Sequence, residues 1–223
     1  MCGRYTLEQG LDEIEAFLNA KADAYGQFHP TYNAAPSQNL PVAYRNERSD
    51  VVIEPMNWGF IGWPPKEGER PFSIINTRDD KITQKPMWNK AVSARRCIVP
   101  ISGFYEWKGP KGKKTPYYIY SSSDPMLGLA GIYSNLSPWE DRRIKTYSII
   151  TTSPNAMMEG IHNRMPAILH PTEFEDWLNP DVSNASEVLD LIRPYPDAAL
   201  AFHEVGRAVG NVRNDNPELI EEV

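Results

Sequence analysis

Residues 97–107 read Cys-Ile-Val-Pro-Ile-Ser-Gly-Phe-Tyr-Glu-Trp, and this stretch sets the pattern for the rest of the chain. Its first five residues are apolar and predict a short strand, and a turn rich in glycine and lysine follows at residues 108–114. Similar segments recur along the chain, separated by proline, glycine and serine. We expect further strands at residues 42–44, 51–58, 117–120, 127–133, 146–151 and 201–205.

Short helices are expected between these strands. Residues 6–9 have the pattern of a capping box, and apolar residues then recur at helical spacing, so a first helix should run to about residue 20. Further helices are expected at residues 154–161, 172–178 and 186–192, the second of these opened by a capping box at 172–175. Because the order lacks a βαβ alternation, we predict one α+β domain over residues 1–223. Short helices should flank a twisted, largely antiparallel, barrel-like sheet.

Composition excludes several classes of protein. With 41% hydrophobic and 11% aromatic residues among 223, the chain should fold, and its twenty prolines indicate many rigid turns. No apolar run approaches the roughly 18 residues of a membrane span, and the first residues do not resemble a signal peptide. Two cysteines are too few for a disulfide scaffold. We therefore expect an intracellular, cytoplasmic, monomeric protein with free thiols and no membrane contact.

Charge is unevenly distributed along the chain. The 23 basic and 29 acidic residues give a net charge of −6, which argues against a general nucleic-acid coater. Residues 85–114 hold eight basic residues against one acid, whereas residues 172–223 hold twelve acids against three arginines. The simpler interpretation is that these charged segments are solvent-exposed surface, with an acidic C-terminal tail from about residue 214. The alternative is a basic segment around Glu106 that binds a few phosphates.

Cys2 follows the initiator Met1, a residue that aminopeptidases remove before a small side chain. Removal would leave an α-amine, with a reference pKa of about 7.7–8.0, beside a thiol of about 8.5. Such a 1,2-aminothiol condenses with an aldehyde to an imine and then closes to a thiazolidine ring. It could equally serve as an N-terminal nucleophile for amide hydrolysis. An accidental cysteine at a frayed end is the third interpretation.

Three other groups of residues could carry chemistry. Glu106 lies between two aromatic residues, where partial desolvation suits acid/base work, although it could simply pair with a nearby lysine. His162 stands two residues before Arg164, which fits proton transfer beside an anion or, alternatively, a capping or core histidine. Asn76 and Arg78 are spaced two apart on an extended segment and should share a face, unless Asn76 is a turn residue.

No pattern in the chain indicates a cofactor. Two cysteines 95 residues apart and four scattered histidines match no metal-ligand spacing. A phosphate-cradling glycine loop is also absent from the sequence. We therefore expect neither a metal nor an organic cofactor.

Taken together, the motifs cover residues 1 to about 211. They are Met1-Cys-Gly-Arg-Tyr5, Tyr32-Asn-Ala-Ala-Pro36, Trp58-Gly59, Asn76-Thr-Arg78, Arg96-Cys97, Pro100, Gly103-Phe-Tyr-Glu-Trp107, Thr151-Thr152, Ile161-His-Asn-Arg-Met-Pro166 and Val205-Gly-Arg-Ala-Val-Gly-Asn211. This set resembles the SOS-response-associated peptidase (SRAP) family of abasic-site processing proteins. The stretch 61–71 does not align cleanly, and Thr77 stands where many members have alanine.

The resemblance implies a sensor of abasic sites in single-stranded DNA. Cys2 would form a thiazolidine with the aldehyde of the ring-opened sugar, giving a covalent DNA–protein cross-link. Asn76 would position the sugar or the Cys2 backbone, Glu106 would act near the amine, and His162 would shuttle protons. The same groups could reverse the link or allow strand scission by β-elimination, as a lyase does.

By the same resemblance, arginines would hold phosphates, and Trp107 and Trp63 would stack on bases beside the lesion. Core packing is the alternative for the tryptophans. The DNA-contact residues implied are Arg4, Asn33, Pro36, Trp63, Arg78, Trp107, Thr151 and Arg164. Two rival functions remain: an N-terminal-nucleophile amidohydrolase that uses Cys2, and a non-covalent single-stranded DNA-binding module that does not need it.

Overall fold

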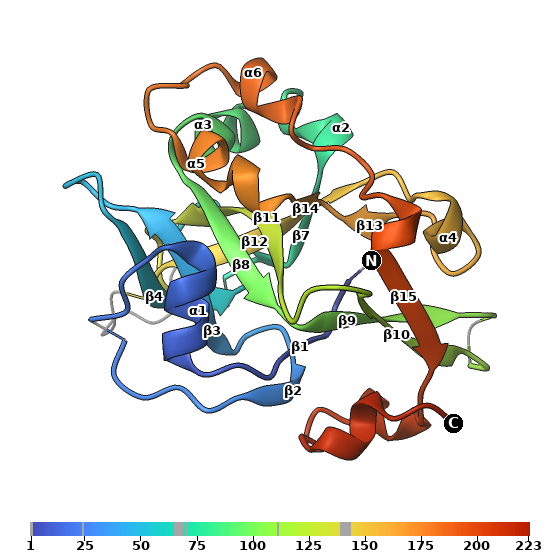
Figure 1. Cartoon of the computed structure of the whole chain (residues 1–223). Coiled ribbons are helices and arrows are strands. Elements are labelled where there is room, and N and C mark those ends of the chain that lie inside the picture. The colour runs from blue at the N-terminus through green and yellow to red at the C-terminus, as the bar shows by residue number, and fades with distance from the viewer. Residues whose placement is uncertain (1, 24, 65–68, 70, 111, 139–143) are drawn as a thin grey trace.

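In a computed structural model of the chain, the residues described are 2–23, 25–64, 69, 71–110, 112–138 and 144–223 (Figure 1). The strands form two main sheets and a small hairpin. The first sheet is antiparallel, with the order β15-β10-β9-β1-β2. Its strands are β1 (Tyr5–Leu7), β2 (Thr31–Ala34), β9 (Gly103–Lys108), β10 (Thr115–Ser121) and β15 (Leu200–Glu204).

The second sheet curls into a ring. Its order is β13-β12-β4-β3-β8-β11-β14, and an additional pairing of β12 with β11 closes the circuit. Most pairs are antiparallel, but β12 runs parallel to both β4 and β7. Its strands are β3 (Asn39–Arg45), β4 (Val51–Trp58), β7 (Asn76–Arg78), β8 (Arg96–Ile101), β11 (Leu127–Ser134), β12 (Thr146–Thr152), β13 (Met165–Pro166) and β14 (Ile168–Leu169). The hairpin consists of β5 (Phe60–Ile61) and β6 (Ser73–Ile74). The predicted α+β class with a largely antiparallel, barrel-like sheet is confirmed.

The stretch 97–107 joins the two sheets. β8 is buried along its whole length in the ring, and the chain then bends at Ser102 to continue as β9 in the other sheet. β9 begins at Gly103, a position where only glycine fits. A Cβ atom there would lie 2.5 Å from the Tyr118 ring and 2.7 Å from the Ile119 carbonyl oxygen. This crossing directs Glu106 toward the junction of the sheets.

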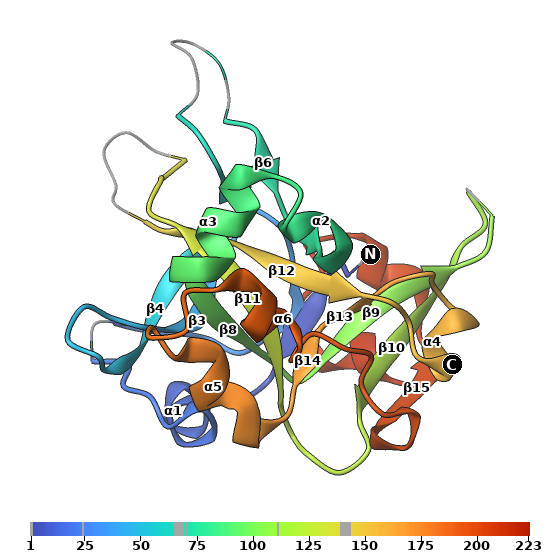
Figure 2. The ribbon, with the colours of Figure 1, turned by 90° about the horizontal axis from the view of Figure 1, so that it is seen from above.

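Short helices cover the outside of the sheets (Figure 2). They are α1 (Leu11–Leu18), α2 (Asp79–Ile82), α3 (Pro86–Ala94), α4 (Ala156–Glu159), α5 (Phe174–Leu178) and α6 (Ala185–Leu189), with 3-10 turns at Pro171–Glu173, Asp197–Ala199, Arg207–Gly210 and Pro217–Ile220. The capping box predicted at residues 6–9 is wrong, because residues 5–7 are buried as β1 between β2 and β9. The helix begins instead after Gly10, where only half of such a box can form: the Gly10 N–H donates to the Glu13 carboxylate at 2.9 Å, and glycine has no side chain to accept a bond in return. The second box likewise lies two residues earlier than predicted, at His170 and Glu173.

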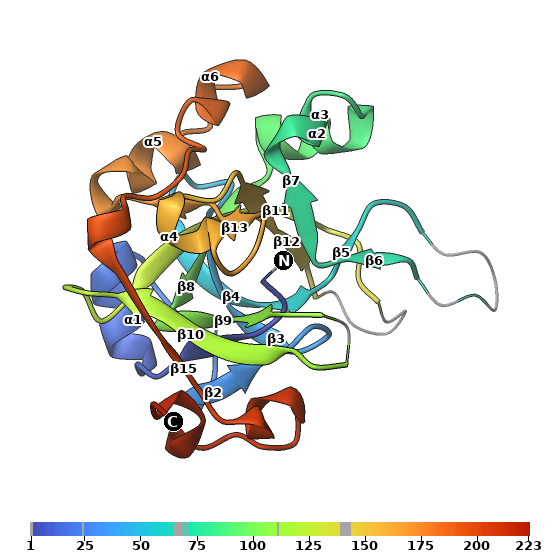
Figure 3. The same cartoon turned by 90° about the vertical axis from the view of Figure 1, so that its right-hand side faces the viewer.

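The C-terminal residues pack against the first sheet (Figure 3). Asp215 accepts hydrogen bonds from the Thr31 hydroxyl and the Tyr32 backbone N–H, and Leu219 is buried in a small core with Tyr105 and Tyr118. The segment from residue 214, expected as an acidic tail, therefore has an anchored place on the fold.

The basic segment 85–114 does not form one patch. Part of it lies on α3 and part beyond the end of β9, and these regions lie apart in all three views (Figures 1–3). Arg96, between them, is buried and donates hydrogen bonds to the backbone carbonyls of Trp177, Val92, Ser93 and Asn179. The expected concentration of the whole basic segment around Glu106 is therefore wrong.

Candidate functional site

Cys2 is fully buried where the two sheets meet. Its carbonyl oxygen accepts a hydrogen bond from the Asn76 side-chain amide at 2.8 Å, and its thiol donates to the Arg4 carbonyl oxygen at 3.7 Å. Burial raises the pKa of the Cys2 thiol, and the nearby negative charge of Glu106 raises it further. The thiol is therefore protonated at neutral pH.

Glu106 reaches Cys2 through strand pairing. β9 lies antiparallel to β1, with Phe104 opposite Tyr5, and the Tyr105 N–H donates to the Arg4 carbonyl oxygen at 3.0 Å. Continuing that register past Phe104 sets Glu106 beside the first residues of the chain. Its side chain is almost completely buried. A buried carboxylate thus lies near enough to the buried Cys2 thiol for its charge to act on it.

Asn76 and Arg78 are presented by β7. The strand pairs with β12 so that the intervening Thr77 is buried and its hydroxyl lies 2.9 Å from that of Ser148. Alternation along the strand places Asn76 and Arg78 on the opposite face. Among the described residues, the buried Asn76 Oδ1 has no hydrogen-bond partner, so this amide offers an acceptor beside the Cys2 backbone.

His162 lies on the loop between α4 and β13. Its backbone N–H donates to the Met158 carbonyl oxygen at 2.8 Å, and its ring Nδ1 accepts from the Arg164 backbone N–H at 3.0 Å. The same Nδ1 also lies 3.1 Å from the Arg164 carbonyl oxygen, and the tautomer of the ring determines which of the two contacts is a hydrogen bond. In either tautomer the Arg164 backbone fixes the orientation of the imidazole.

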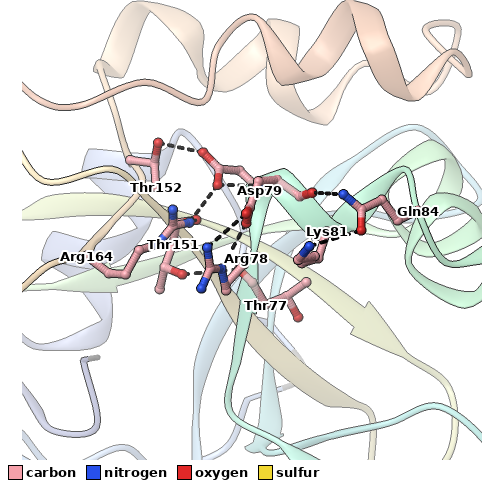
Figure 4. A network of polar contacts seen from close by, with 9 residues as sticks. Thr77, Arg78, Asp79, Lys81, Gln84, Thr151, Thr152 and Arg164 are labelled. Carbon is pink, nitrogen blue, oxygen red and sulfur yellow. Dashed lines mark hydrogen bonds and ion pairs between the residues drawn. The ribbon is translucent and has the colours of Figure 1, made fainter.

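Arg78 and Arg164 open into one hollow, of about 440 Å³, beside α2. Each guanidinium is paired with an aspartate, and Figure 4 shows the pair of Arg164 with Asp79. Arg78 donates two hydrogen bonds to Asp80, at 2.9 and 2.8 Å, whereas Arg164 donates to Asp79 at 2.6 Å and to the Thr151 carbonyl oxygen. No motif in the sequence assigns a role to either aspartate, although both follow directly after Arg78.

Arg4 and Asn33 bind the C-terminal segment. Arg4 donates to the Asn33 side-chain oxygen at 2.8 Å and to the Val209 carbonyl oxygen at 2.9 Å. The Asn33 amide donates to the carbonyl oxygens of Asn211 and Asn214 at 3.1 and 2.7 Å. Both side chains, expected on a DNA rim, are thus committed to holding residues 207–214.

The aromatic residues expected to contact DNA differ in their solvent exposure. Trp63 is 53% exposed and lies parallel to Phe72, itself 65% exposed, with ring centroids 6.3 Å apart. Trp107 is half-buried against Tyr105. Sequence inspection missed Phe72, which follows the proline-rich stretch that aligns poorly with the family.

The remaining expected contacts are less accessible. Thr151 is buried and donates from its hydroxyl to the Thr77 carbonyl oxygen at 3.4 Å. Pro36 is half-buried in the turn that follows β2. These two residues therefore shape the backbone around the site more than they offer donors to a ligand.

Comparison of the chain with known proteins identifies its family. The model of the SOS response associated peptidase (SRAP) family matches residues 1–212. The chain belongs to the SRAP family. It is 36% identical to the abasic site processing protein YoqW of Bacillus subtilis, with 99% of each chain covered. It is 32% identical to the abasic site processing protein HMCES of Rattus norvegicus, covering 87% of this chain and 65% of that one.

The fold of this SRAP chain agrees with a solved structure. A crystal structure of a protein from Bacteroides thetaiotaomicron superposes with a TM-score of 0.84 at 26% identity, covering both chains fully. Within the described residues of the SRAP chain, no three His, Cys, Asp or Glu side chains are grouped as metal ligands would be. No helix in that part of the chain has the length and hydropathy needed to cross a membrane.

Proposed function

We propose that this SRAP protein captures abasic sites in single-stranded DNA by forming a thiazolidine between Cys2 and the sugar aldehyde. The observation that carries the proposal is the confinement of Cys2, buried with Glu106 and held through its carbonyl by Asn76. The names of its relatives, which are abasic site processing proteins, supply the substrate class. Removal of Met1 is part of the proposal, because it creates the amine.

The bond changes balance with the loss of one water. The Cys2 amine adds to the aldehyde carbon, and the carbinolamine loses its hydroxyl as water to give an imine. The thiol sulfur then adds to the same carbon, the imine nitrogen keeps one proton as a secondary amine, and the five-membered ring closes. Neither an oxidant nor a metal enters these steps.

The environment of the thiol determines the order of these steps. Because burial and Glu106 raise its pKa, the thiol is a poor nucleophile at neutral pH, and the amine attacks first. Formation of a cationic imine beside the sulfur then favours loss of the thiol proton. Glu106 is suited to take that proton, and the His162 imidazole to donate the proton with which the carbinolamine hydroxyl leaves as water. The same pair supports reversal, and the imine also permits β-elimination at the sugar.

The hollow beside α2 suits the DNA backbone near the lesion. Arg78 is half-exposed there and presents a planar fork that matches a phosphate. The Trp63–Phe72 pair offers exposed aromatic faces, and stacking on a base is worth about 1–3 kcal/mol. Arg4 and Asn33 contribute instead by fixing the first strand.

The decisive experiment mixes the protein with a single-stranded oligonucleotide that carries one abasic site. A species that survives denaturing electrophoresis, with the summed mass minus one water, is expected. Intact-protein mass spectrometry first establishes that Met1 is absent from the sample. A processed wild-type protein that yields no such species would refute the proposal.

Variants separate the chemical roles. Cys2→Ser should lose the thiazolidine while keeping an imine that borohydride traps, because the amine remains. Glu106→Gln and His162→Ala should slow cross-link formation or reversal without lowering the melting temperature by more than a few degrees. Unchanged rates in both variants would remove these two groups from the mechanism.

A further inference from the structure

The two arginines of the hollow are neutralised in different ways. Arg164 and Asp79 are largely buried, with side chains 10% and 22% exposed, whereas Arg78 and Asp80 are 50% and 46% exposed. An arginine–aspartate pair therefore occurs once inside the fold and once at the surface. A DNA phosphate approaching the hollow could replace the aspartate of the exposed pair, but not that of the buried pair.

The buried pair is held by several further bonds. The second carboxylate oxygen of Asp79 accepts from the Thr152 hydroxyl at 2.7 Å, and its first oxygen also accepts from the Asp80 backbone N–H. Displacing Asp79 from Arg164 would leave a buried carboxylate without its cation, a costly state. This pair belongs to the scaffold, and it ties α2 to the loop that carries His162.

The exposed pair is built differently. Asp80 occupies the Nε and Nη2 edge of the Arg78 guanidinium with both of its oxygens. This is the edge by which arginine binds a phosphate in bidentate fashion. Within the described part of the chain, Arg78 is the only side chain that hydrogen-bonds the Asp80 carboxylate. A phosphate must therefore displace Asp80 to use that edge of Arg78.

We propose that Asp80 is a specificity-determining residue that competes with DNA phosphate for Arg78 and so weakens non-covalent binding to every single strand. The proposal rests on the DNA-binding role given to Arg78 above. Intact and damaged strands carry the same phosphates, so competition lowers non-covalent affinity for both equally. The covalent bond forms only at an aldehyde and is not weakened. Asp80 thereby increases the ratio of trapped lesions to occupied intact DNA.

The test measures binding to intact DNA, where no covalent step occurs. Fluorescence anisotropy with a labelled thymidine oligonucleotide, over a series of potassium chloride concentrations, compares the wild type with Asp80→Asn. The variant should bind about two- to five-fold more tightly, the range of an exposed ion pair. Its plot of log affinity against log salt should steepen by about 0.7, as one further phosphate is neutralised.

Two controls isolate the exchange at Arg78. Asp176→Asn on α5 makes the same change of charge at an exposed position outside the hollow and should leave affinity unchanged. In an Arg78→Ala background, adding Asp80→Asn should have no effect, because the competed cation is gone. The substitution leaves the backbone of residue 80 unchanged, so its carbonyl oxygen still accepts the hydrogen bond from the Gln84 side chain at 2.7 Å. An unchanged melting temperature verifies the fold.

Each outcome decides the matter. The inference is overturned if Asp80→Asn binds like the wild type, if Asp176→Asn tightens binding equally, or if the gain persists without Arg78. Absence of measurable binding in both wild type and Asp80→Asn overturns it as well. Cross-linking to abasic DNA is scored separately, so a protein that cross-links but shows no Asp80 effect keeps the proposed function and loses only this inference.

Discussion

Replacing Asp79 by alanine should destabilise the protein through the arginine that it leaves behind. Arg164 is buried, and among the described residues its Nε already lacks a partner. Removing one member of a fully buried ion pair costs about 3–5 kcal/mol. Because the two side chains are 10% and 22% exposed, we expect about 2–3 kcal/mol here. For a chain of 223 residues that corresponds to a fall in melting temperature of about 5–10 °C.

Calorimetry on Asp79→Ala, Arg164→Ala and the double variant measures this effect. The double variant should be more stable than the sum of the single changes predicts, by about 1 kcal/mol or more, because no buried charge is left unpaired. Asp79→Asn keeps an acceptor for Thr152 and should lose less than the alanine variant. A melting temperature of Asp79→Ala equal to that of the wild type, or strict additivity in the cycle, would show that the pair is not coupled as the structure indicates.

Three further predictions concern other parts of the molecule. Burial raises the pKa of the Cys2 and Cys97 thiols above their unfolded values, so stability is retained below about pH 8.5 and falls as pH rises further. At pH 9.5 each thiol should lower the unfolding free energy by about 1 kcal/mol, and urea unfolding of each single serine variant should show a decline smaller by about that amount than the decline of the wild type. Arg96→Ala should lower the unfolding free energy by about 2–4 kcal/mol without changing affinity for single-stranded DNA, since four backbone carbonyls lose their donor; a weaker DNA complex at unchanged stability would contradict its structural role. Trp63→Ala should weaken DNA binding by about 1–3 kcal/mol in anisotropy while the melting temperature stays constant, and a large loss of stability instead would show that the ring packs on the fold.

Local pattern was sufficient for the long strands of the ring but not for short elements or for those that depend on distant partners. Residues 51–58 form β4 with the predicted bounds, because the segment begins with three β-branched residues and Pro55 is incompatible with a helix interior. Residues 5–7 also satisfy a helix-start pattern, and only pairing with β2 and β9 decides that they are extended. α2 has only four residues, too few for a periodicity to be recognised, and the sequence does not predict it. β7 was expected only as an extended segment that places Asn76 and Arg78 on one face.

The candidate site shows the same division. Cys2, Glu106 and His162 stood out as residue types suited to particular chemistry, and the contacts of Cys2 with Asn76 and Arg4 are compatible with that selection. Ion-pair partners could not be deduced in this way. A sequence shows that an arginine is present, but which carboxylate neutralises it depends on side-chain geometry. Arg164 lies 85 residues from Asp79, a pairing that no local pattern indicates.

The arrangement around Cys2 also bears on its proposed role as a nucleophile, which requires the residue to have a fixed position. First residues usually fray, and fixing the backbone of one residue costs about 1–2 kcal/mol. Asn76 binds the Cys2 carbonyl, the Tyr105 N–H binds the Arg4 carbonyl, and the Arg4 guanidinium binds the Val209 carbonyl. Each such hydrogen bond contributes about 1 kcal/mol, so together they compensate for a large part of the roughly 3–6 kcal/mol that ordering residues 2–4 costs. Because the last bond comes from the C-terminal segment, that segment helps to hold the start of the chain in place. Arg4 and Asn33 hold β1 through polar groups that face the protein, so a substitution at either residue should act on the proposed chemistry through the position of Cys2.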